Sequence, residues 1–427
     1  MTRIFVLFLS FLILTSCNSN KCRQQCNDKG LDEECCPQID SAALLQKNQV
    51  EKINVFIETS GSMAGYMPAS KPTTGFQILV ADILTKLNTN FPNKVFIYYL
   101  DEQNRPCSIV TLPQAKNDIL NGNFKWSGST YIPNMMDTVN SYLKDNSVNL
   151  LVTDLIYSPE KSKTKITSIA STDIFSILAP IKNYSSSIIC LFSQYRSSIC
   201  ADKNPTDKSP YYLLLQGKSE NIFNVESIVY GSIKNSDNEY KEINFGLHNF
   251  PYYSLLPYTE ISSNFIANSC NAFQNAFVSI QDINLSDNGG NIEFWLGLDL
   301  KDLPEYSKTD VYLKQNLEMQ LNGKVVIVST EKLPYSNVVA DDKPIAQKCS
   351  HLIKLRVSEL SDCVSILSLS LKCTSPDWPI ELNEKTSENN REKTFGLEKI
   401  ISGFKQAYIS DQDEYFFKNL SIALIKE

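Results

Sequence analysis

The sequence predicts an α/β domain with a mostly parallel, doubly wound sheet flanked by helices, followed by a mainly antiparallel, sandwich-like β domain with a late helix. Two observations support this fold. Between residues 50 and 231, short apolar runs alternate with segments whose apolar residues recur every three or four positions, which indicates alternating strands and helices. From residue 232 onward, an alternation with period two replaces the helical spacing, as in 292–300. We therefore place a domain boundary at 231/232.

Each element of the first domain follows from its own pattern. Apolar, β-branched runs predict strands, and stripes such as that of 74–90 predict helices packed on the sheet. The expected strands are 53–57, 94–100, 107–112 (an antiparallel edge), 148–153, 187–192 and 211–216. The expected helices are 74–90, 132–143, 166–183 and 219–230.

The second domain, 232–427, carries turn signals between alternating runs. Asn322-Gly323 separates the runs 317–321 and 324–328, and this dipeptide between such runs predicts a β-hairpin. A helix is expected at 395–408 and a final strand at 415–425.

The first 17 residues have the pattern of a targeting segment. Arg3 is followed by an apolar run from Ile4 to Leu14, which is too short to span a bilayer. Leu14-Thr15-Ser16-Cys17 matches the bacterial lipoprotein signal, in which the cysteine is lipidated and becomes the new N-terminus. We expect an envelope protein anchored by lipid at Cys17 in the outer membrane and facing the periplasm, with exposure on the cell surface as the alternative. A cleaved secretory signal without lipid is the alternative.

Residues 18–49 form a cysteine-rich tether in this interpretation. In an oxidising compartment, disulfides from Cys22 and Cys26 to Cys35 and Cys36 are the expected arrangement, since adjacent cysteines rarely pair with each other. Zinc is the alternative, but the spacing does not match usual zinc ligands. Cys190, inside an apolar strand, is expected to be a buried thiol.

Oxygen-bearing side chains follow two of the predicted strands. Glu58, Ser60 and Ser62 come directly after the run 53–57, and Asp154 follows 148–153. Because carboxyl ends of parallel strands meet at one edge of a sheet, these side chains are expected to converge. One further hydroxyl, that of Thr130, lies in the loop Gly128-Ser129-Thr130. Carboxylates and hydroxyls suit a hard cation such as Mg²⁺ or Mn²⁺.

This pattern resembles the von Willebrand factor A domains and their metal-ion-dependent adhesion site, over roughly 50–231. That site reads Asp-x-Ser-x-Ser after the first strand, a Thr in a later loop and an Asp after the fourth strand. The matching residues are Glu58, Ser60, Ser62, Thr130 and Asp154, and Glu58 departs from the family by one methylene. In the family the first carboxylate often acts through a bound water, and an acidic residue of a protein partner completes the metal's coordination.

The resemblance therefore implies a cation-dependent binding protein with a protein partner. Two other classes stay open: a structural envelope lipoprotein with a vestigial metal site, and a metal-dependent hydrolase. The hydrolase needs a base or nucleophile beside the cation, and neither His248 nor His351 lies in a catalytic motif. The net charge of −7, with acidic and basic residues interspersed, argues against a nucleic-acid partner.

Overall fold

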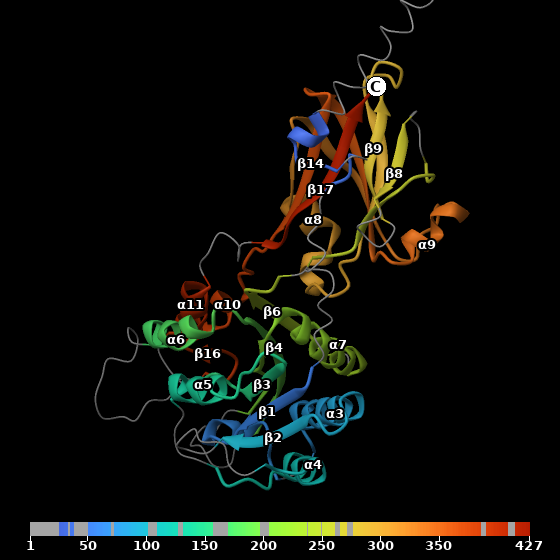
Figure 1. Cartoon of the computed structure of the whole chain (residues 1–427). Coiled ribbons are helices and arrows are strands. Elements are labelled where there is room, and N and C mark those ends of the chain that lie inside the picture. Colours follow the sequence, from blue (N-terminus) through green and yellow to red (C-terminus); the bar gives the residue numbers. More distant parts are fainter. Residues whose placement is uncertain are drawn as a thin grey trace, which may run out of the picture. The chain divides into compact units, whose positions relative to one another are not determined.

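The computed structural model describes residues 25–32, 35–37, 50–69, 72–100, 109–126, 131–156, 170–196, 205–236, 238–248, 250–260, 265–270, 276–385, 390–408 and 415–427. The chain divides into two compact units (Figure 1). The α/β unit consists of Lys47–His248 and Thr374–Glu414. The β unit consists of Met1–Gln46, Asn249–Cys373 and Tyr415–Glu427. The chain therefore leaves the β unit twice and returns to it twice, a division that the expected boundary at 231/232 does not describe.

A six-stranded sheet lies at the centre of the α/β unit, in the order β2-β1-β3-β5-β4-β6. Its strands are β1 (Lys52–Glu58), β2 (Val95–Leu100), β3 (Ser147–Thr153), β4 (Ser185–Tyr195), β5 (Thr206–Gly217) and β6 (Tyr240–Phe245). β1 pairs in parallel with both β2 and β3, whereas the β3–β5, β4–β5 and β4–β6 pairs are antiparallel. The sheet is therefore mixed, and the expectation of a mostly parallel sheet is wrong for its second half.

The connection between β4 and β5 explains this difference. No helical pattern separates these strands, so the chain has no crossover and β5 returns beside β4 in antiparallel orientation. The predicted edge strand 107–112 is reduced to a single bridge between Val110 and Ile97 within the described residues. Thr111 instead caps α4 (Leu112–Asn121) through a hydrogen bond from Gln114 N, and a helix was not expected there.

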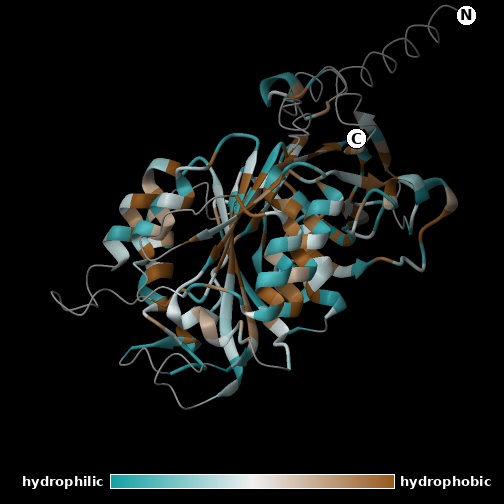
Figure 2. Ribbon diagram, turned by 90° about the horizontal axis from the view of Figure 1, so that it is seen from below, coloured by the Kyte–Doolittle hydropathy of each residue, from teal (hydrophilic) through white to brown (hydrophobic). Residues whose placement is uncertain are grey.

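Helices cover both faces of this sheet, as expected for an α/β fold (Figure 2). One face packs on α3 (Gly75–Asn90), α4 and α7 (Ser219–Asn235), which share an apolar cluster with the sheet. The other face packs on α5 (Ile132–Asn140), α6 (Ala170–Leu178) and α11 (Leu397–Ala407). α11 comes from the segment 374–414, so a C-terminal piece of the chain completes the α/β unit.

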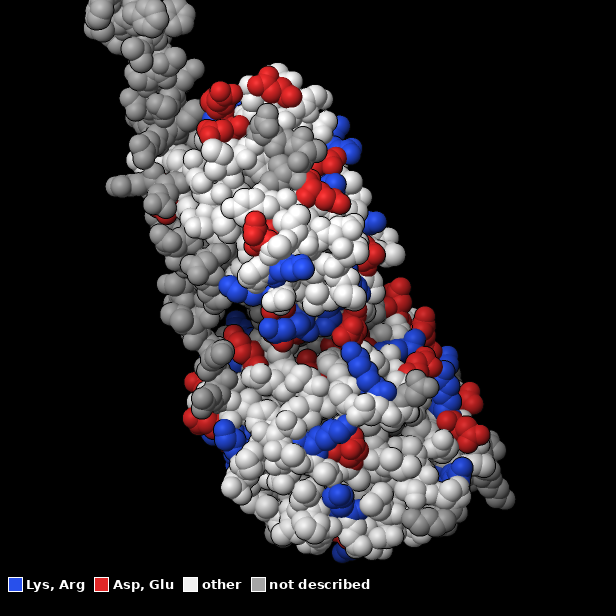
Figure 3. All heavy atoms as spheres, turned by 90° about the vertical axis from the view of Figure 1, so that its right-hand side faces the viewer, with Lys and Arg blue, Asp and Glu red and all other residues white. Residues whose placement is uncertain are grey.

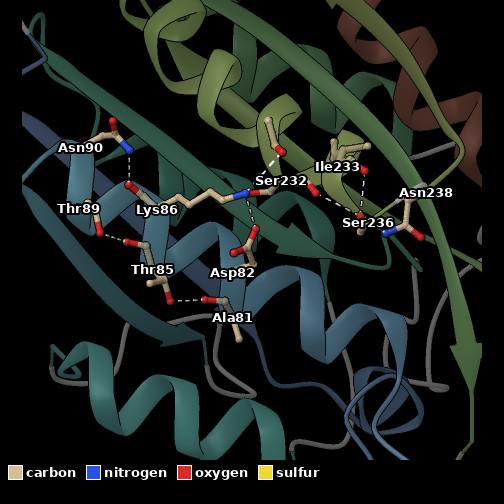
Figure 4. Close-up of polar contacts among 11 residues, drawn as sticks. Ala81, Asp82, Thr85, Lys86, Thr89, Asn90, Ser232, Ile233, Ser236 and Asn238 are labelled. Atoms are coloured by element: carbon tan, nitrogen blue, oxygen red, sulfur yellow. Dashed lines mark hydrogen bonds and ion pairs between the residues drawn. The ribbon is translucent and has the colours of Figure 1, made fainter.

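Polar contacts join α3 to α7 on the first face (Figure 4). Lys86 Nζ forms an ion pair with Asp82 at 2.8 Å and donates to the carbonyl of Gly231 at 3.4 Å. Burial raises the pKa of Asp82, but hydrogen bonds from Lys86 and Ser232 outweigh this effect and lower it. The α3 start is also well defined, because Thr74 and Gln77 form a reciprocal capping box.

The segment 374–414 is embedded in the α/β unit. It contains α10 (Trp378–Glu381), the short parallel pair β15 (Asn383–Glu384) and β16 (Thr394–Phe395), and α11. Trp378 Nε1 donates to the carbonyl of Glu242 on β6 at 2.9 Å, and the hydroxyls of Thr394 and Tyr212 are 2.7 Å apart. Phe404 stacks on Phe245 with ring centroids 5.1 Å apart.

The β unit contains two mainly antiparallel sheets. The first has the order β12-β13-β10-β7 and consists of β7 (Tyr253–Leu256), β10 (Ile292–Leu298), β12 (Gly323–Lys332) and β13 (His351–Leu360). The second has the order β11-β14-β17-β9-β8 and consists of β8 (Ile266–Cys270), β9 (Ala276–Ile283), β11 (Leu317–Gln320), β14 (Val364–Lys372) and β17 (Tyr415–Lys426). Apolar residues of both sheets share one cluster. Short helical segments connect the strands: η3 (Glu305–Lys308), α8 (Asp310–Asn316), η4 (Ala340–Asp342) and α9 (Lys343–Ala346).

The hairpin predicted at Asn322-Gly323 is wrong. β11 pairs with β14 and β12 pairs with β13, so the two runs lie in different sheets. A Cβ at Gly323 would meet the carbonyl oxygen of Glu359 at 1.9 Å, so glycine is needed here for a close backbone approach.

The described part of residues 18–49 packs against the β unit. Cys26 and Cys35 form a disulfide with a Cα–Cα distance of 5.3 Å, one of the pairings expected, and their cluster includes Val364 of β14. Lys29 Nζ donates to the Val364 carbonyl at 2.6 Å and pairs with Asp362 at 2.9 Å. Cys36 is also disulfide-bonded, and Cys22 lies outside the described residues.

Candidate functional site

The candidate site begins where β1 ends. Alternate residues of β1 face opposite sides of the sheet, so Phe56 lies in the cluster under α5 and Ile57 in the cluster under α3. Glu58, the last residue of β1, is 2% exposed. Its Oε2 accepts a hydrogen bond from Thr153 Oγ1 at 2.5 Å. Since Thr153 is the last residue of the parallel neighbour β3, this bond joins the ends of two adjacent strands.

Thr153 is a site residue that the sequence reasoning missed. Its Oγ1 donates to Glu58 and also accepts from Leu155 N at 2.9 Å, so it fixes both the carboxylate and the loop after β3. The Glu58 carboxylate thus lies against the neighbouring strand. The sequence did contain a signal for this role, because Thr153 carries a hydroxyl and directly precedes Asp154 at the end of a predicted strand.

The two serines lie on the turn after β1. Thr59 anchors this turn, because its N and Oγ1 both donate to the carbonyl of Leu100 at the end of β2, at 3.2 and 2.6 Å. The chain then enters the 3₁₀ turn η1 (Gly61–Gly65). Ser60 Oγ and Ser62 Oγ are 3.0 Å apart, so the structure brings these two predicted residues together.

Asp154 lies directly after β3 and is fully buried. Its Oδ1 accepts a hydrogen bond from Ile156 N at 3.0 Å. Its Oδ2 is buried and has no hydrogen-bond partner within the described part of the chain. The next residue, Leu155, has a φ of +51°, which is unfavourable for a residue with a side chain. Such strained backbone is concentrated at functional sites, where the surrounding structure maintains it.

The environment of Asp154 links it to the serine turn. Burial raises the pKa of Asp154 above its ordinary value, because removal from water disfavours the ionised carboxylate. The Ser62 hydroxyl, the Ile156 amide and the charge of Arg391 act in the opposite direction. The Ser62 hydroxyl thus interacts both with the Asp154 carboxyl group and with the hydroxyl of Ser60.

Arg391 is the second site residue that the sequence reasoning missed. Its guanidinium lies 4.7 Å from the ring centroid of Tyr195, and the residue is 9% exposed. The Tyr195 ring packs against η1, where a Cβ at Gly65 would meet it at 2.3 Å, and it contacts the Tyr66 ring edge-on at 5.1 Å. Burial and then the charge of Asp154 raise the pKa of Tyr66, whereas Arg391 lowers it.

A compositional signal for Arg391 was available. The chain has 40 basic residues, of which six are arginines. Arginine is favoured over lysine for buried charge and for stacking on aromatic rings. In a chain this rich in lysine, each arginine is a candidate for such a position.

The structure also bears on the other residues singled out in the sequence. Thr130 and Cys17 lie outside the described residues. Cys190 is buried, as expected, and burial raises the pKa of its thiol. His248 is exposed at the end of the first part of the α/β unit, and His351 is buried in the β unit.

The donor set can be compared with the needs of a hard cation. Ser60, Ser62 and the Oδ2 of Asp154 supply oxygen atoms, and the buried Oδ2 is an acceptor left without a hydrogen. Within the ranges described above, the structure has no cluster of three or more His, Cys, Asp or Glu side chains arranged for a metal. The expected site contains only two carboxylates, Glu58 and Asp154. Its other oxygen atoms are neutral hydroxyls, which Mg²⁺ and Mn²⁺ also accept as ligands.

Comparison of the chain with protein-family models, with curated proteins and with solved structures finds no match. Among the described residues, no helix combines the length and apolarity needed to cross a membrane. On the face shown in Figure 3, Lys and Arg are interspersed with Asp and Glu.

Proposed function

We propose that this chain is a lipid-anchored envelope protein whose α/β unit binds Mg²⁺ or Mn²⁺ and, through it, an acidic group of a protein partner. In this proposal the α/β unit has a von Willebrand factor A-like fold and the two sheets of the β unit form a sandwich. The central position of β1, in parallel with β2 and β3, and the shared apolar cluster of the β unit support these two assignments.

One observation supports the cation site most directly: the buried Oδ2 of Asp154 has no hydrogen-bond partner among the described residues. A buried ionised oxygen without a partner costs free energy, and a cation would remove that cost. Ser62 lies beside Asp154 and Ser60 lies beside Ser62, so further oxygen ligands are at hand. Because the serine hydroxyls are neutral and the site has few carboxylates, its ligands do not fully neutralise a divalent ion. The remaining positive charge favours an acidic ligand from the partner.

The test is a melting experiment on the purified protein with Mg²⁺, with Mn²⁺ or with a chelator. At a hundredfold excess over the dissociation constant, binding stabilises the folded state by about 2.7 kcal/mol, a melting shift of several degrees. Asp154→Asn should abolish this shift. It should not lower the metal-free melting temperature, because the raised pKa shows that the buried charge of Asp154 is disfavoured.

Asp342→Asn is the matched control. Asp342 is equally buried, accepts hydrogen bonds from Tyr258 N and Thr259 Oγ1 at 2.9 and 2.7 Å, and belongs to the β unit. This variant should keep the cation-dependent shift. A wild-type melting temperature that is the same with millimolar Mg²⁺, Mn²⁺ or chelator would contradict the proposal.

The second candidate function is a structural envelope lipoprotein with a vestigial metal site. Arg391 favours it, since its positive charge already acts on Asp154. The same melting experiment separates the two candidates, because a vestigial site gives no cation-dependent shift.

A further inference from the structure

Arg391 reaches the candidate site from a segment remote in sequence. It precedes Thr394, whose hydroxyl lies 2.7 Å from that of Tyr212 in the buried part of β5. The residues that follow Arg391 are also held by the pairing of β16 with β15, in which Thr394 lies beside Asn383. The backbone directly after Arg391 is thus fixed in the α/β unit.

The guanidinium is placed on the turn that carries the serines. It lies over the Tyr195 ring at 4.7 Å, and the same ring lies against Gly65 of η1, the turn containing Ser62. A planar guanidinium on an aromatic face is a favourable arrangement that limits its movement. At 9% exposure its charge is poorly screened by water.

The two strand ends place Arg391 near Asp154: Thr153, which precedes Asp154, pairs with Tyr212, and the Tyr212 hydroxyl lies 2.7 Å from that of Thr394, three residues after Arg391. The positive charge of Arg391 and a divalent cation are attracted by the same carboxylate and repel each other. A divalent ion that competes with the guanidinium for this carboxylate must therefore move the guanidinium away when it binds.

We propose that Arg391 is a built-in competitor of the divalent cation: its guanidinium supplies the positive charge at Asp154 in the cation-free state and weakens cation binding. This inference rests on the proposed function. It assigns a regulatory role to the segment 374–414, because whatever moves this segment changes the affinity of the site.

The experiment compares Mn²⁺ dissociation constants, measured by titration calorimetry, for the full-length wild type, Arg391→Gln and Arg391→Lys. Arg391→Gln should bind Mn²⁺ at least tenfold more tightly. A tenfold change corresponds to about 1.4 kcal/mol, a modest fraction of what a nearby unit charge exerts on a divalent ion. Arg391→Lys keeps the charge and should stay within about threefold of wild type.

Arg356→Gln is the control, since Arg356 pairs with Glu293 at 2.6 Å in the β unit, and it should leave the constant unchanged. If Arg391→Gln does not fold, amide exchange of wild-type residues 390–396 provides the test. Added Mn²⁺ should accelerate this exchange if the guanidinium is displaced.

The outcomes separate the two proposals. Equal Mn²⁺ affinity of wild type and Arg391→Gln overturns the role of Arg391 and leaves the proposed function intact. Tighter binding by Arg391→Gln than by the wild type supports the competition. If neither protein binds millimolar Mn²⁺, the proposed function is refuted and the competition with it. In the exchange experiment, unchanged or slower exchange on Mn²⁺ binding also overturns it.

Discussion

His351, the first residue of β13, should make the β unit sensitive to acid. The ring is 4% exposed, and its nitrogens lie 2.9 Å from Ser350 Oγ and 3.0 Å from the Lys308 carbonyl. Burial, and then the charge of Lys332, lower the pKa of His351 to about 4, although the contact with the Lys308 carbonyl opposes this shift.

The size of the effect follows from linkage. In the unfolded chain a histidine has a pKa of about 6.5. Above this pH, His351 is neutral in both states and its contribution is constant. As the pH falls from 6.5 to 4, the unfolded chain binds a proton that the folded protein does not, so the free energy of unfolding decreases. The pKa difference corresponds to about 3 kcal/mol in total, most of which is lost by pH 4.5.

The assay is urea unfolding at pH 7 and pH 4.5, with amide exchange of β10 and β13 reporting on the β unit. His351→Gln cannot take up the proton, so its stability should depend less on pH than that of wild type by about 2–3 kcal/mol over this range. His248→Gln alters an exposed residue of the α/β unit and should behave as wild type. The reasoning fails if wild type and His351→Gln lose the same stability between these two pH values.

Two further predictions concern the segment 374–414 and the N-terminus. Phe404→Ala should destabilise the α/β unit by about 3–5 kcal/mol, because a buried ring stacked on Phe245 is lost and a cavity remains. Amide exchange should therefore accelerate in β4 and β6 but not in β13 and β14, and an equal change in both units would show that this segment does not belong to the α/β unit. Cys17→Ala should release the protein from the membrane fraction, since stable anchoring requires acyl chains. Mass spectrometry of the N-terminal peptide checks this, and an unmodified Cys17 in the wild type would contradict it.

Local patterns predicted individual elements well. The apolar stripe at 74–90 corresponds to α3, and the run 94–100 corresponds to β2. These elements are encoded by neighbouring residues, since helical periodicity and caps act within a few positions. The late helix expected at 395–408 was likewise found as α11.

Pairing between distant segments was not predictable in the same way. Asn322-Gly323 has the local pattern of a hairpin turn, but the strands on its two sides do not pair with each other. β11 pairs with β14, and β12 pairs with β13. The helix α11 was placed in the β domain because sequence order suggested it, whereas its apolar face packs on α6 of the α/β unit. The local pattern of a single sequence does not indicate which distant segments will pack against each other.

The candidate site shows the same contrast. Ser60, Ser62 and Asp154 follow strands whose carboxyl ends converge, so strand-end chemistry was sufficient to find them. Arg391 is 237 positions beyond Asp154, and only the packing of the segment 374–414 brings its charge to the site. Thr153 was overlooked because a threonine inside a strand run is ordinarily a packing residue.

The segment 374–414 also fixes when the protein can finish folding. A chain is synthesised from its N-terminus, and domains usually fold in that order. Here the part of the sheet face that α11 covers stays exposed until residue 407 has emerged, although α5 and α6 can pack beside it earlier. The β unit has the same property, because β17, the last strand, inserts between β14 and β9. Neither unit reaches its final state before residues 407 and 426 are available, so apolar surfaces of both units stay exposed until late in synthesis.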